Sequence, residues 1–197
     1  SGGKLETLRN SPHLEAFQER GYEVLLLDDP VDDFWTGVVE RYRDKPLKSV
    51  AKGAADLVER EEEAEKSDQA REERFAPLLK ALAERLAEDV SSVRLSKRLT
   101  ASPACLVGEA HSMTPQMEQL FRGMGQSVPK LKRILEVNPG HAVLERLRRR
   151  FEADGSLGDY PELLYGQATL AEGGAPADPA RFARLVADLL ERDLEGK

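Results

Sequence analysis

The stretch RFAPLLKALAERLAEDVSSVRLSKRL, residues 74–99, decides the fold class because its apolar residues change period partway along. In the first half they recur every three or four positions, which predicts an amphipathic helix. In the second half Val93 and Leu95 alternate with polar residues, which predicts a strand, and Leu99 continues that alternation. We therefore expect an α+β domain built around this junction. The helical stripe consists of Phe75, Leu78, Leu79, Leu82 and Leu86.

Two later stretches are predicted to complete a small sheet with this strand. ACLVGEA (104–110) follows the turn-like TASP and is predicted to be its hairpin partner. KRILEVNP (132–139), which ends in the breakers Asn138 and Pro139, is predicted to be the third strand. The expected sheet is three-stranded and antiparallel.

The first third of the chain is predicted to be a small α/β subdomain. Ser11 as N-cap, Pro12 at the first helical position and Gly21 past the end bracket a short helix. The run EVLLL (23–27) is nearly continuous in apolar residues, which is typical of a strand buried on both faces of a parallel sheet. A second helix is expected over residues 30–42.

The tract EREEEAEKSDQAREER (59–74) marks the predicted domain boundary, because it holds hardly any apolar group large enough to pack. Residues 1–60 then form the α/β subdomain and residues 75–197 the α+β domain. Residues 61–74 between them are either a charged linker or a solvated helix.

The tail is predicted to hold two amphipathic helices, starting at Asp159 and Asp178 and separated by Gly173 and Gly174. Such a pair exposes more apolar surface than its members can hide against each other, so pairing with a second copy gives an intersubunit four-helix bundle. The alternative is that both helices fold back on the sheet of their own domain. The predicted dimer interface is Leu163, Leu164, Ala168, Phe182, Leu185, Val186 and Leu189.

Composition and motifs argue against several functions. The formal net charge of −7 disfavours binding to nucleic acid or to an anionic membrane. The basic run 146–150 is more typical of a solvated or intersubunit helix face than of a nucleic-acid site. The sequence contains no glycine-rich phosphate loop and no metal motif, so we expect no cofactor, metal or catalytic residue. The lone Cys105 is predicted to be a core group and fits a reducing cytoplasm.

All three methionines lie in HSMTPQMEQLFRGMG (111–125). Thr114 and Pro115 can start a helix there that Gly123 and Gly125 end. Periodicity alone favours packing of its apolar face in the core, and an exposed, adaptable binding face is the alternative. The residues of this predicted face are Met113, Met117, Leu120, Phe121 and Met124.

Several stretches together resemble the heat-shock protein 90 chaperones, and their bacterial form most closely. NSPHLEAFQERGYEVLLLDDPVDDFW (10–35) resembles the end of that family's middle domain. RLTASPA (98–104), MTPQMEQLF (113–121), ILEVNP (134–139) and LLYGQATLAEGG (163–174) resemble its carboxyl-terminal domain. Each motif alone is weak, but the set in this order is specific and covers nearly the whole chain.

The resemblance implies a fragment of an ATP-dependent homodimeric chaperone that dimerises and contacts unfolded or partly folded client proteins. ATP and magnesium belong to other parts of the full-length chaperone, so none is expected here. The resemblance also implies that the methionine segment is exposed and binds clients together with Phe34 and Trp35. The alternative function is a non-catalytic scaffold or a nucleic-acid-binding module.

Overall fold

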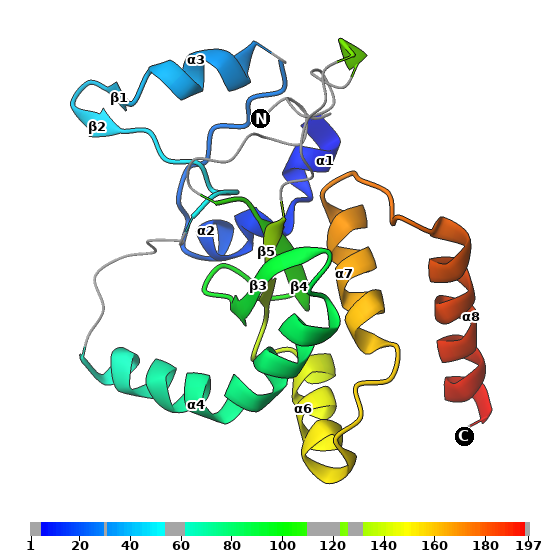
Figure 1. Cartoon of the computed structure of the whole chain (residues 1–197). Coiled ribbons are helices and arrows are strands. Elements are labelled where there is room, and N and C mark those ends of the chain that lie inside the picture. Colours follow the sequence, from blue (N-terminus) through cyan, green and yellow to red (C-terminus); the bar gives the residue numbers. More distant parts are fainter. Residues whose placement is uncertain (1–4, 30, 54–61, 110–122, 126–131, 196–197) are drawn as a thin grey trace.

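A three-stranded sheet lies at the centre of the computed structural model, which describes residues 5–29, 31–53, 62–109, 123–125 and 132–195 (Figure 1). Its strands are β3 (Val90–Leu95), β4 (Ala104–Val107) and β5 (Arg133–Val137). The order is β3-β5-β4, with β5 parallel to β3 and antiparallel to β4. The predicted α+β class is confirmed, but the prediction of an antiparallel sheet is wrong because this sheet is mixed.

The predicted hairpin of β3 with β4 is also wrong. β5 inserts between these strands and pairs with both, so Leu135 lies opposite Val93 on one side and Leu106 on the other. Alternation within a strand fixes which residues share a face, but it does not fix which strands become neighbours. β5 takes the central place in the sheet although it is the last of the three strands in the sequence.

One face of the sheet is covered by three helices that supply most of the core. These are α4 (Glu62–Arg85), α6 (Ala142–Asp154) and α7 (Tyr160–Ala171). Leu135 and Val137 of β5 point into this core, as period-two alternation requires. The helical residues buried there are Phe75, Leu78, Leu82, Leu144, Leu147, Leu164 and Ala168.

Residues 62–74 of the charged tract form the first half of α4. Residues 69–74 are exposed, whereas Phe75 and Leu78 beyond them are fully buried. Pro77 lies within the helix at this change of environment. Residues 62–74 are therefore a helix and not a linker. The division of the chain into two domains stays a prediction.

The other face of the sheet is covered by the N-terminal segment, residues 5–19. It comprises α1 (Leu5–Arg9), the 3-10 helix η1 (Pro12–Leu14) and α2 (Glu15–Glu19). Ser11 caps η1 as predicted, since its hydroxyl accepts a hydrogen bond from the His13 amide. Gly21 ends the helical region at a φ of +68°, a conformation that suits glycine. Pro12, His13 and Leu14 are all buried.

The prediction of a buried strand over residues 23–27 is wrong. These residues belong to no strand, and the Leu25 side chain is 72% exposed. An apolar run can form a strand only where another strand offers it backbone partners, and no described residue does so here. The predicted second helix is confirmed but shorter: α3 spans Asp32–Val38, and a small hairpin of β1 (Arg41–Tyr42) and β2 (Lys45–Pro46) follows it.

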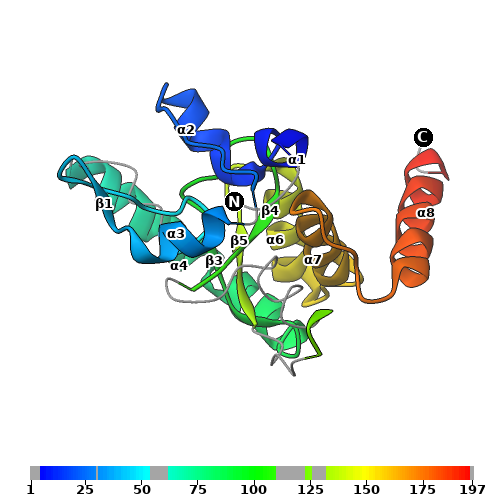
Figure 2. The ribbon, with the colours of Figure 1, turned by 90° about the horizontal axis from the view of Figure 1, so that it is seen from above.

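The last helix, α8 (Pro179–Glu195), lies beyond α7 at one end of the molecule in both views (Figures 1 and 2). A glycine-containing turn joins it to α7. Gly173, at a φ of +78°, donates its amide hydrogen to the Leu170 carbonyl, and Gly174 donates to the Thr169 carbonyl. These two bonds form a Schellman motif that ends α7.

Candidate functional surfaces

The apolar surface of α8 is broader than its contact with α7. The stripe with helical spacing, Phe182, Leu185, Val186 and Leu189, is half-buried. Beside it, Leu190 is 61% exposed and Leu194 is 72% exposed. Exposed leucines next to a half-covered stripe indicate that the apolar face continues past what α7 covers.

Two features hold α8 against α7. A Cβ atom at Gly166 would lie 2.5 Å from the Phe182 ring, so the glycine allows this ring to sit directly on the α7 backbone. The Glu162 carboxylate accepts hydrogen bonds from Arg181 of α8, at 2.7 Å, and from Arg85 of α4, at 2.9 Å. Gly166 thus permits the close approach of α8 to α7 within the protomer.

The predicted interface residues fall into two groups. Leu164 and Ala168 are buried in the core of their own protomer. The others, Leu163, Phe182, Leu185, Val186 and Leu189, are half-buried around the α7–α8 contact. Leu163, Leu185 and Leu189 line one small pocket between the two helices. The interface itself stays a prediction.

A groove of about 620 Å³ lies between the end of α4, α7 and the start of α8. Apolar groups such as Tyr165 and Phe182 line part of it. Its charged lining is mainly acidic, because Arg85 and Arg181 are the basic members and both pair with Glu162. The other acidic members are Glu84, Glu88, Asp89 and Asp178.

Of the predicted client-binding residues, only two have described side chains. Trp35 is 36% exposed on α3 and its indole N–H donates to Asp32 at 2.7 Å, and Met124 is 58% exposed. Met113, Met117, Leu120 and Phe121 lie outside the described residues, as does the side chain of Phe34. Trp35 has exposed apolar neighbours in the chain, namely Val31, Val38, Val39 and Tyr42.

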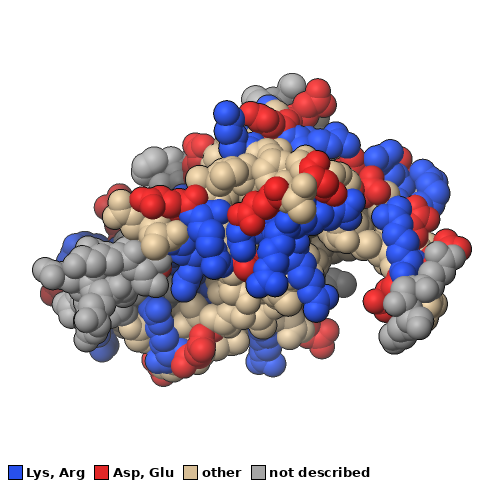
Figure 3. All heavy atoms as spheres, turned by 90° about the horizontal axis from the view of Figure 1, so that it is seen from below, with Lys and Arg blue, Asp and Glu red and all other residues tan. Residues whose placement is uncertain are grey.

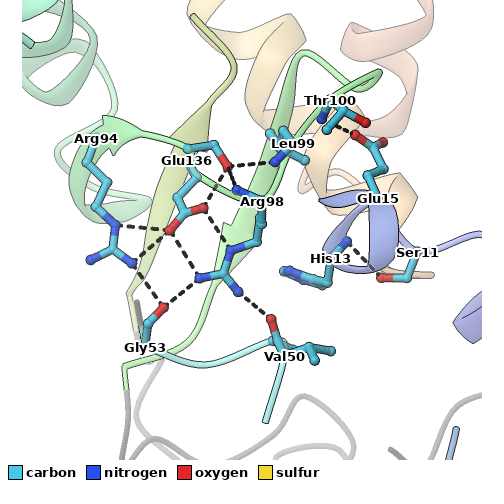
Figure 4. A network of polar contacts seen from close by, with 12 residues as sticks. Ser11, His13, Glu15, Val50, Gly53, Arg94, Arg98, Leu99, Thr100 and Glu136 are labelled. Atoms are coloured by element: carbon cyan, nitrogen blue, oxygen red, sulfur yellow. Dashed lines mark hydrogen bonds and ion pairs between the residues drawn. The ribbon is translucent and has the colours of Figure 1, made fainter. Parts of the chain in front are cut away.

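A buried ion-pair network joins the sheet to the N-terminal third (Figure 4). The Glu136 carboxylate accepts hydrogen bonds from Arg98 Nε at 2.9 Å, Arg94 Nη2 at 2.8 Å and the Ser96 hydroxyl at 2.9 Å. Arg98 is fully buried, and its remaining donors reach the carbonyls of Val50 and Gly53. A buried charge pair with this many hydrogen bonds satisfies both partners, as burial requires.

Glu15 makes a second polar connection between the same parts. Its carboxylate accepts from the backbone amides of Thr100, Ala101 and Ser102 at 2.7, 2.8 and 3.1 Å. Burial opposes ionisation of this carboxyl, but the Ser102 hydroxyl and the three amides outweigh it, and the pKa is lowered from 4.5. The Ala16 amide also donates to the Arg98 carbonyl.

Sequence reasoning missed this network, although one signal was present. Glu136 interrupts the apolar strand RILEV on the side opposite Leu135 and Val137. A charged residue inside an otherwise buried strand requires a buried partner, and Arg98 in RLTASPA is that partner. No local pattern indicated which basic residue it would be.

The other candidate sites are explained by ordinary structural roles. Burial raises the pKa of the Cys105 thiol well above its usual value, and the residue packs with Leu99 and Val107, so the prediction of a core cysteine is confirmed. His141 caps α6 by accepting from the Val143 amide. Among the described residues there is no cluster of three or more potential metal-ligating side chains. No helix in the described part of the chain is long and apolar enough to cross a membrane.

The basic run on α6 does not form a uniform patch. Arg148 pairs with Glu145 and Glu152, Arg149 pairs with Glu145, and Arg150 pairs with Asp154. Figure 3 shows lysine and arginine side chains interspersed with acidic ones over the lower face of the molecule. A surface of alternating charge offers little attraction to a polyanion.

Comparison with known proteins places the whole chain in one family. It matches the family model described as "Hsp90 protein" over residues 1–197. It is 51% identical over 199 residues to "Chaperone protein HtpG" of Mycobacterium tuberculosis, and 51% over 200 residues to the protein of that name from Frankia casuarinae. The Mycobacterium leprae protein is 49% identical over 204 residues. Each alignment covers 98% of this chain and 31% of the relative, so the chain spans about a third of their length.

Proposed function

The chain belongs to the Hsp90 family, and from this premise we propose that it is the homodimerisation part of a bacterial ATP-dependent chaperone. The observation that carries the proposal is the apolar face of α8, which extends past the surface that α7 covers. A second copy of the same helix is the partner that fits, because it offers an equal apolar face and closes the assembly by two-fold symmetry.

The energetics of this surface support a dimer. Burying one exposed leucine is worth roughly 1.5 to 3 kcal/mol, and a two-fold interface buries each leucine twice. Leu190 and Leu194 are already partly covered, so from both copies they supply less than the ~6 to 12 kcal/mol of full burial, before the cost of association. A micromolar Kd needs a net of about 8 kcal/mol, so the half-buried stripe of α8 has to contribute the remainder.

The test uses two exposed leucines, so that folding of the protomer is spared. Leu190→Asp with Leu194→Asp should give a soluble monomer of 21.9 kDa by light scattering, whereas the unaltered chain has twice that mass. Leu25→Asp is the matched control, since Leu25 and Leu194 are equally exposed at 72%. A dimeric double variant, or a monomeric unaltered chain, would refute α8-mediated dimerisation.

We further propose that the methionine segment and the α3 surface around Trp35 bind unfolded client proteins. Trp35 supports this, since its ring is partly exposed among exposed apolar residues. Methionine suits such a role because its unbranched, polarisable side chain adapts to many partner shapes.

The triple variant Met117→Gln, Leu120→Asn and Phe121→Asn should suppress client aggregation less well while its melting temperature and dimer mass stay near those of the unaltered chain. A large fall in melting temperature would identify the segment as core and would end the client-binding proposal.

ATP turnover should be absent from the isolated chain. Hydrolysis that a single substitution within residues 1–197 abolishes would contradict this.

A further inference from the structure

The N-terminal segment contacts the turn from which α8 leaves the protomer. His13 Nε2 lies 3.4 Å from Glu172 Oε1, and both side chains are largely buried. Glu172 is the C-cap residue of α7, and its other carboxylate oxygen pairs with Arg133 of β5. The side chain of a single buried glutamate therefore joins η1, the sheet and the end of α7.

A second contact reaches the same turn from α1. A Cβ atom at Gly173 would lie 3.3 Å from the Thr7 methyl group, which places α1 directly against the Schellman turn. Both ribbon views show α1 beside the end of α7 that leads to α8 (Figures 1 and 2). The segment itself is anchored to the domain through Glu15 and the amides of residues 100–102.

We propose that the N-terminal segment acts as a clamp on the α7–α8 turn and thereby sets the direction in which the dimerisation helix α8 projects. The clamp consists of the contact of His13 with Glu172 and the contact of Thr7 with Gly173. The contacts of Phe182 with Gly166 and of Arg181 with Glu162 both lie in the first turn of α8, next to the α7–α8 turn. The direction of α8 therefore depends on the position of this turn. A clamped turn preorganises α8 for its partner and strengthens the dimer.

The coupling runs in both directions, as linkage requires. If the N-terminal segment favours the dimer when it contacts the α7–α8 turn, then dimerisation in turn favours that contact. The dimer half of this inference rests on the proposed function, whereas the clamp itself does not.

The clamp is tested first in the monomeric Leu190→Asp, Leu194→Asp chain, so that dimerisation has no influence. His13→Ala should speed hydrogen exchange of the Gly173 and Gly174 amides about tenfold, because their hydrogen bonds open more often. His13→Gln should restore slow exchange, since its amide can donate to Glu172. Gln18→Ala, an exposed change in the same segment, is the control. Unchanged exchange in His13→Ala would overturn the clamp.

The link to assembly is then measured in the dimer-forming chain by sedimentation. His13→Ala should raise the dimer Kd roughly five- to tenfold, and His13→Gln should leave it near the unaltered value. Faster exchange with an unchanged Kd would overturn the coupling but keep the clamp. A monomeric unaltered chain would refute the proposed function, and the exchange result would still judge the clamp. If His13→Ala does not fold, Glu172→Ala removes the same contact from α7, with the same expected results.

Discussion

Replacing Glu136 by glutamine should be among the most damaging single substitutions in the sheet. The carboxylate is 4% exposed and is the buried counter-charge of Arg98, which is fully inaccessible. Glutamine keeps the shape of the Glu136 side chain but removes its negative charge. Its amide NH2 group would also face the N–H and O–H donors that now point at the carboxylate. Leaving a buried charge without its partner costs roughly 3 to 5 kcal/mol. That is a large share of the ~5 to 15 kcal/mol by which domains are stable.

Removing both charges should cost less than removing one. Arg98→Met with Glu136→Leu abolishes the desolvation penalty, but the Val50 carbonyl loses its donor, whereas the Gly53 carbonyl keeps the donor from Arg94. We expect a net loss of about 1 to 3 kcal/mol, the cost of an unpaired buried polar group. Arg94→Met is the contrasting case, because Arg94 is 37% exposed, and it should cost no more than about 1 kcal/mol.

The assay is urea unfolding followed by circular dichroism and by fluorescence of Trp35, the only tryptophan. Because a dimer links stability to concentration, all variants are compared at one protein concentration or in the monomeric background. Two outcomes would refute the reasoning. One is a cost below about 1 kcal/mol for Glu136→Gln. The other is a double variant that is as unstable as Glu136→Gln.

Three other substitutions probe separate contacts. Glu15→Gln should lower the unfolding midpoint at pH 7, and the difference should shrink as the pH falls below 4.5. The reason is that a carboxyl with a lowered pKa stabilises the fold above its unfolded pKa of 4.5 and loses this stabilisation as the pH falls through its folded pKa. Hydrogen bonds from Arg148 lower the pKa of Glu145 to about 2, so Glu145→Gln should behave likewise. Its melting temperature should lie below that of the unaltered chain at pH 7, and the two should converge only as the pH falls from 4.5 towards 2. Gly166→Ala should displace the Phe182 ring and cost about 1 to 3 kcal/mol, and adding Phe182→Leu should recover much of this in the same melt.

The elements with strong local signals were predictable from sequence. The helix that ends in the stripe Phe75 to Leu86 and the alternating strand after it both form, and the stripe packs on the sheet. Ser11 and Gly21 act at the helix ends where their chemistry indicated. These features depend on residues within a few positions of each other, so the sequence specifies them directly.

The candidate surfaces were predictable only in part. The sequence showed that the tail holds two helices with more apolar surface than they can bury against each other. It did not show that Leu164 and Ala168 would pack in the core of their own protomer. Helical periodicity identifies a face and leaves its partner undefined, since a core and an interface have the same composition. The clamp contact of His13 with Glu172 had no sequence signal, because these residues are 159 positions apart.

Local sequence patterns were enough to identify the family, the α+β class, the ends of several helices and the apolar face of α8. They did not specify the strand order β3-β5-β4, the exposure of Leu25, or the pairing of Glu136 with Arg98, all of which came from the folded structure. One cause accounts for all three. Period and capping are properties of neighbouring residues, whereas strand pairing and buried charge pairs form between distant segments, whose choice of partner depends on how the whole chain packs.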